Sequence, residues 1–97
     1  MADVATVILS AHRITNGTLV TGANYLKSIT CLGATTAGHL RFYDGTDNTG
    51  TLLLEVDVPG NSNNINNIII PGPGLLFATA LYVEMPTGYH VSVCYGK

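Results

Sequence analysis

The chain carries little charge, and this shortage excludes several classes of protein. Only 10% of its 97 residues are Asp, Glu, Lys or Arg, whereas 46% are hydrophobic. That combination excludes intrinsic disorder, which requires low hydrophobicity and high charge. Four basic residues and a net charge of −2 argue against a nucleic-acid-binding protein, because contacts with phosphates need clustered Lys and Arg.

Long apolar runs and a basic leader are also missing. No apolar run approaches the ~20 residues that span a membrane, and the opening MADVATVILS lacks the basic region of a signal peptide. We therefore expect no membrane partner and synthesis in the cytoplasm. The length fits one domain over residues 1–97, with one modest core.

The low charge also bears on assembly. Twelve Thr and eight Asn supply much of the polarity, and neutral polar groups cost less to desolvate at a contact than charges do. A chain of this kind favours a homo-oligomer or another assembly that covers part of its surface. The alternative is a Thr- and Asn-rich surface that simply stays in water.

Eleven Gly and four Pro divide the chain into short runs that favour β-strands over helices. Asn16-Gly17 predicts a tight hairpin turn, and the Asn-rich tract at 61–67 predicts a loop. Seven or eight short antiparallel strands of this spacing predict an all-β fold, a β-sandwich of the jelly-roll type. The predicted strands cover residues 4–10, 18–21, 25–32, 39–44, 51–58, 67–70, 80–85 and 89–95, and residues 12–15 form a weaker run.

Alternation of apolar and polar residues predicts which side chains face the core. Leu40 and Phe42 share one face of their strand, and Leu81, Val83 and Met85 share one face of theirs. The opposite faces then present Tyr43, Leu53 and Tyr82, which we take as candidate interface residues because tyrosine is favoured at protein contacts. Residues 4–9 are apolar on both faces, so they form either a central strand or one that a partner chain covers. From this run the candidate interface residues are Val4, Val7 and Leu9, and we expect partner contacts within the N-terminal segment 1–24.

No group of residues predicts catalysis, a cofactor or a metal. Cys31 and Cys94 do not have zinc-site spacing, and we expect two reduced, half-buried thiols, although a disulfide between neighbouring strands is geometrically possible. Asp44 and Asp47 lie in a segment that resembles a calcium loop without its bidentate Glu, so a turn explains them. His12, His39 and His90 are far apart in sequence; exposed positions are expected, although a fold could bring two of them together.

Three segments together resemble a known family. They are ITCLGATTAG (29–38), LRFYDGTDNTGTLLLEVDVPG (40–60) and IIIPGPGLLFATALYVEMPTGYHVSVCYG (68–96). Over residues 25–97 the chain resembles small capsid decoration (cement) proteins of tailed bacteriophages and cyanophages. The shared pattern is a strand ending in Tyr-Asp-Gly, a Thr/Gly loop, an apolar strand, a Pro-Gly turn, a Leu-Tyr-Val strand and a final β-hairpin.

The resemblance implies a structural virion protein, not an enzyme. Such a protein docks on the capsid exterior, often as a homotrimer at three-fold positions, with the major capsid protein as its partner. By bridging neighbouring subunits it stabilises the capsid lattice. Two alternatives stay open: a head or tail fibre or adaptor component, and a carbohydrate-binding β-sandwich, for which the absence of tryptophan is unfavourable.

Overall fold

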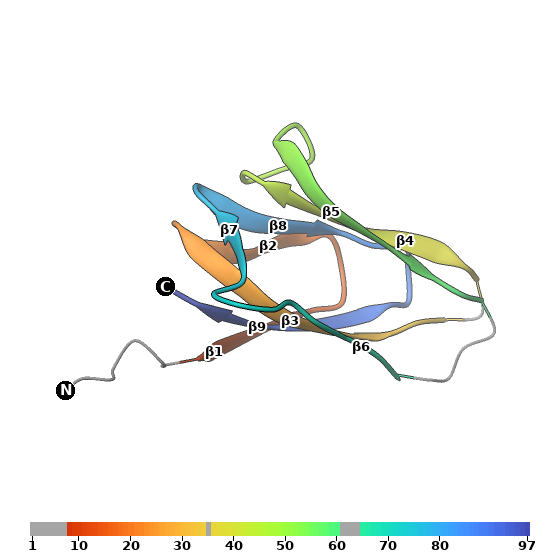
Figure 1. Cartoon of the computed structure of the whole chain (residues 1–97). Coiled ribbons are helices and arrows are strands. Elements are labelled where there is room, and N and C mark those ends of the chain that lie inside the picture. The colour runs from red at the N-terminus through yellow and green to blue at the C-terminus, as the bar shows by residue number, and fades with distance from the viewer. Residues whose placement is uncertain (1–7, 35, 61–64) are drawn as a thin grey trace.

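The computed structural model describes residues 8–34, 36–60 and 65–97, which fold as an all-β sandwich. Two antiparallel sheets lie face to face as two layers (Figure 1). The predicted β-sandwich is confirmed, with nine strands in the described residues instead of seven or eight. The strands are β1 (Leu9–Arg13), β2 (Gly17–Thr21), β3 (Asn24–Leu32), β4 (Gly38–Asp44), β5 (Thr51–Val58), β6 (Ile65–Ile69), β7 (Leu75–Phe77), β8 (Ala80–Glu84) and β9 (His90–Gly96).

The five-stranded sheet has the order β1-β9-β3-β6, and β7 pairs with β3 as well. Strands β6 and β7 follow one another along the same edge of β3, separated by the Pro-Gly-Pro-Gly segment at 71–74. Gly72 and Gly74 there have φ angles of +69° and +102°, which glycine adopts at little cost. Sequence alternation missed β7 because it has only three residues.

The Asn-rich tract and the N-terminal run differ from their predictions. Asn66 belongs to β6 instead of a loop, so this strand begins before the predicted range 67–70. The Asn67 side chain accepts a hydrogen bond of 2.8 Å from the Thr30 hydroxyl. Strand β1 is one strand that pairs with β9 at the sheet edge, so its described part is not a central strand. Val4 and Val7 lie outside the described residues.

The core lies between the sheets, and alternation predicted most of it. Leu40 and Phe42 on β4 are fully buried, as are Leu81 and Val83 on β8. Burial of such apolar surface is the main favourable contribution to folding. The largest buried side chains are Tyr89, Phe42, Phe77, Leu26, Ile29, Leu40, Leu81, Val83, Val91 and Val93.

A β-bulge overturns one predicted orientation. In the β4–β5 pair, Phe42 lies opposite Leu54 but Tyr43 lies opposite Leu52, so Leu53 is an extra residue on β5. A bulge shifts the alternation of side chains by one position. Leu53 therefore packs against the core instead of facing outward, and Leu52 is exposed beside Tyr43.

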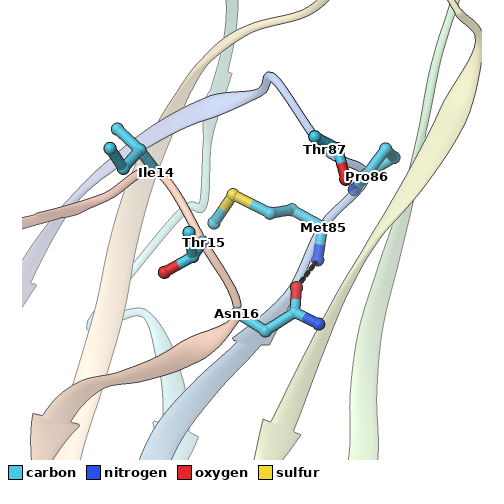
Figure 2. Close-up of a pocket in the computed structure, with 6 residues that line it drawn as sticks. All are labelled: Ile14, Thr15, Asn16, Met85, Pro86 and Thr87. Carbon is cyan, nitrogen blue, oxygen red and sulfur yellow. Dashed lines mark hydrogen bonds between the residues drawn. The ribbon is translucent and has the colours of Figure 1, made fainter.

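The predicted hairpin turn at Asn16-Gly17 and the Pro86-Thr87-Gly88 segment are both crossings between the sheets. Strands β1 and β2 lie in different sheets, and so do β8 and β9, so neither Asn16-Gly17 nor Pro86-Thr87-Gly88 joins paired strands. Asn16 instead connects the two crossings, because its Oδ1 accepts a hydrogen bond of 2.7 Å from the Met85 N–H (Figure 2). Turn residues favour reversal of the chain, but the reversal itself does not determine which sheet the next strand joins.

Asp44 anchors the segment that connects β7 to β8. Its carboxylate accepts hydrogen bonds from the backbone N–H groups of Ala78, Thr79 and Ala80, at 3.1, 2.8 and 3.3 Å. These hydrogen bonds, of which the one from Thr79 has the largest effect, lower the pKa of Asp44 below its usual value. In the same loop, Asp47 accepts from the N–H and hydroxyl of Thr49, as expected of a turn.

Candidate interaction surface

The outer face of the four-stranded sheet is covered by ion pairs. Arg41 Nε donates to Glu55 Oε2 at 2.8 Å, and a second guanidinium nitrogen lies 3.5 Å from Glu84 Oε1. His39 Nδ1 lies 2.5 Å from Asp57 Oδ1. These pairs join neighbouring strands at the surface, where water and salt screen them and their contribution to stability is small. A partner that covered this ion-pair face would have to desolvate several charged groups.

Tyr43 and Tyr82, two of the predicted interface residues, lie on the ion-pair face. Their rings meet edge to face, with centroids 6.2 Å apart, and the Tyr43 hydroxyl donates to Glu84 Oε1 at 3.3 Å. Desolvation, followed by the neighbouring Glu84 carboxylate, raises the pKa of Tyr43. Both tyrosines are half-buried and already contact residues of their own sheet. Their role in docking stays a prediction.

The outer face of the five-stranded sheet has a different composition. Strand register and burial place twelve side chains on it, none of them Asp, Glu, Lys or Arg, and we call it the neutral face. Its members are Ser10 and His12 on β1, His90, Ser92 and Cys94 on β9, Tyr25, Ser28, Thr30 and Leu32 on β3, Asn67 and Ile69 on β6, and Leu76 on β7.

Large apolar side chains on the neutral face are open to solvent. Ile69 is 81% exposed and Leu76 47%, and Tyr25 and Leu32 are each 37% exposed. Exposed apolar groups gathered on one face mark a surface that another molecule covers. Alternation along β3 and β6 determines which of their side chains point outward. The neutrality of the whole face depends on five strands from distant parts of the chain.

The two basic residues on strands of this sheet direct their charges toward loops. Lys27 is the extra residue at the β3 bulge, and its ammonium donates to the Pro73 carbonyl at 3.2 Å. Arg13 donates to the carbonyls of Thr15 and Asn16 at 3.0 and 3.2 Å. Both cations are therefore hydrogen-bonded to backbone carbonyls of the loops that flank the sheet.

Leu9 lies at the margin of the sandwich, not on the neutral face. It pairs with Tyr95 and shares the core-facing side of β1 with Ala11, yet it is 40% exposed at the end of the strand. Of the described residues among the six predicted interface residues, only Tyr43 and Tyr82 are brought together. Two lie outside the described residues, Leu53 packs on the core, and the other three divide between the ion-pair face and the sandwich margin.

A pocket of about 300 Å³ opens where the two crossings between the sheets meet (Figure 2). Ile14, Met85 and Pro86 supply its apolar lining, and Thr15, Asn16 and Thr87 complete it. The six lining side chains contain no titratable group, so the pocket offers apolar surface and neutral hydrogen-bonding atoms. Such a lining is suited to holding a side chain or a small neutral molecule.

The chemistry-bearing residues are distributed over the whole sandwich. Cys31 is buried on β3, where burial raises the pKa of its thiol, and Cys94 is half-buried on β9. Both thiols are free, as predicted, but Cys31 is fully buried in the core instead of half-buried. Within the described residues, no three His, Cys, Asp or Glu side chains are placed to hold a metal ion. His12 and His90 are brought together, the possibility that the sequence left open.

Comparisons with known proteins identify no relative of this chain. No protein-family model matches the chain, and neither does any curated protein or solved structure. In the part of the chain that the structure describes, no helix is long and apolar enough to cross a membrane. By its fold and its surfaces, the protein is a small β-sandwich with one charged and one neutral outer face.

Proposed function

We propose that this chain is a structural virion protein that decorates the exterior of a tailed-phage capsid. Its partner is the major capsid protein, and the neutral face is the surface that meets the shell. One observation carries the proposal: the twelve described side chains of the neutral face include no Asp, Glu, Lys or Arg, and among them Tyr25, Leu32, Ile69 and Leu76 are exposed. The resemblance of residues 25–97 to decoration proteins supplies the identity of the partner.

The area of the neutral face fits a repeated, modest contact. Four strands about 4.8 Å apart and about 23 Å long give this face a flat outline of roughly 450 Å². We expect one copy to bind weakly when only this small face is covered. Copies at symmetry-related positions, each bridging neighbouring subunits, add their contributions and stabilise the mature lattice to which they bind.

The test uses heads of the phage that encodes this chain, assembled without it and expanded. Purified protein is expected to co-sediment with these heads and to saturate at a fixed number of copies per head. Failure to bind would overturn the proposal. Binding to a fibre or a tail instead would favour an adaptor, and binding to a glycan array would favour a carbohydrate-binding module.

The docking surface has its own prediction. Ile69→Glu places a charge on the neutral face, and we expect binding to expanded heads to weaken about tenfold or more, since burying an unpaired carboxylate is costly. Ile69 is 81% exposed, so the folding stability of the variant protein should differ little from that of the wild type. The readout is the dissociation constant from quantitative co-sedimentation.

Leu52→Glu is the matched control, because Leu52 is 44% exposed on the opposite, ion-pair face. It makes the same apolar-to-charged change, and head binding should stay at the wild-type level. The reverse result, with Leu52→Glu or Tyr82→Ala impairing binding and Ile69→Glu leaving it intact, would move the docking surface to the ion-pair face.

A further inference from the structure

Two of the three histidines of the chain form a pair on the neutral face. His12 lies on β1 and His90 on β9, and both side chains are exposed. Their rings are stacked, with centroids 5.9 Å apart and planes inclined by 24°. The residue directly opposite His12 is Ser92, two positions beyond His90 on the same face of β9. The docking proposal assigns no role to this pair.

We propose that His12 and His90 form a two-histidine site for a late first-row divalent cation such as Zn²⁺ or Ni²⁺. Imidazole is a preferred ligand of these ions, in contrast to Mg²⁺ and Ca²⁺, which take oxygen ligands. Two imidazoles on one zinc ion, with Zn–N bonds of about 2.1 Å, have ring centres about 5 Å apart. The observed separation is slightly larger, and rotation of two exposed side chains closes it.

The surroundings of the pair leave it accessible to a cation. Arg13, the neighbour of His12 in sequence, turns its guanidinium to the carbonyls of Thr15 and Asn16 instead of toward the rings. His39, by contrast, is engaged with Asp57 on the opposite sheet. With two protein ligands, a tetrahedral ion keeps two positions open toward solvent. These positions lie on the neutral face, where water or a partner's side chain completes the coordination.

The experiment is a titration of the chain, prepared without an affinity tag, with zinc in otherwise metal-free buffer, and the heat of binding is measured by calorimetry. We expect one ion per chain, and no binding of Mg²⁺ under the same conditions. His12→Ala and His90→Ala should each weaken zinc binding at least about tenfold. Loss of a residue that only supports a ligand already lowers metal affinity about 10–100-fold, and loss of a ligand itself lowers it at least as much. Thermal melting of each variant checks that these exposed substitutions leave the fold intact.

The chain offers matched controls. His39→Ala removes the third histidine from the other sheet, and Cys94→Ser removes the half-buried thiol from the neutral face. Both variants should bind zinc as the wild type does. No binding by the wild type, or binding that persists in the double variant of His12 and His90, would overturn the proposal. Because the titration uses the isolated chain, its failure leaves docking on heads untouched.

Discussion

Phe42→Ala is expected to lower the free energy of unfolding by about 3–5 kcal/mol, the cost of removing a buried aromatic ring. Phe42 is fully buried on β4, between β5 and β8, where it lies opposite Leu54 and Val83. Neighbours on both sides come from well-paired strands, so the cavity cannot collapse without distorting the sheet. Urea unfolding monitored by circular dichroism measures the loss directly.

Tyr82→Ala is the comparison that tests the assignment of faces. Tyr82 lies opposite Tyr43 on the outer side of β8, half-buried, and its loss removes an edge-to-face contact without opening the core. We expect a loss of about 1 kcal/mol or less, near the usual cost of a substitution outside the core. Equal losses for Phe42→Ala and Tyr82→Ala would show that the faces of these strands are assigned wrongly.

Asp44→Ala is expected to lower the free energy of unfolding by about 2–3 kcal/mol, because hydrogen bonds to a charged group are strong and the part-buried Ala80 N–H would lose its acceptor. Three consecutive backbone N–H groups, from Ala78 to Ala80, donate to the Asp44 carboxylate. Its removal frees the segment that leads from β7 into β8. Urea unfolding at neutral pH measures the effect, and Asp47→Ala is the control, since Asp47 accepts hydrogen bonds only within its own exposed loop.

The same carboxylate gives a pH dependence of known sign. Hydrogen bonds, first of all the one from Thr79, lower the pKa of Asp44 in the folded chain. A group with a lowered folded pKa stabilises the fold above its unfolded pKa of about 3.9, and this contribution is lost as the pH falls through the folded value. The wild type should therefore lose more stability than Asp44→Asn between neutral pH and pH 3. Parallel pH profiles for the two proteins would contradict this role of Asp44.

Alternation predicted where several strands lie and which side chains most of them bury. Strand β5 has the predicted bounds, and β4 and β8 bury the residues that the pattern assigned to the core. A period of two identifies a strand with one face in a core without reference to its neighbours. The pattern failed at Leu53, because an unpaired extra residue in β5 shifts all alternation beyond it.

The candidate surface was harder to predict than the strands. The sequence pointed to Tyr43 and Tyr82 because tyrosine favours interfaces. Alternation also places Arg41 beside Tyr43 on β4 and Glu84 beside Tyr82 on β8, whereas the contact of Glu84 with Tyr43 and Arg41 depends on the pairing of these two strands. The outward positions of β3 and β6 could have been found by alternation, since Thr30, Leu32 and Ile69 all follow it. That the rest of this face is neutral depends on β1, β7 and β9 lying in the same sheet.

The sequence by itself determined the all-β class, the bounds of β5 and the core-facing residues of β4, β8 and β9. These follow from local properties: glycine and proline limit the length of each run, and side chains alternate along an extended strand. Only the tertiary structure decided which strands share a sheet, and with it the two crossings at Asn16 and Pro86, the neutral face and the meeting of His12 with His90. The physical reason is that pairing between distant strands depends on packing the whole core, and a turn residue reverses the chain equally well within a sheet or between two.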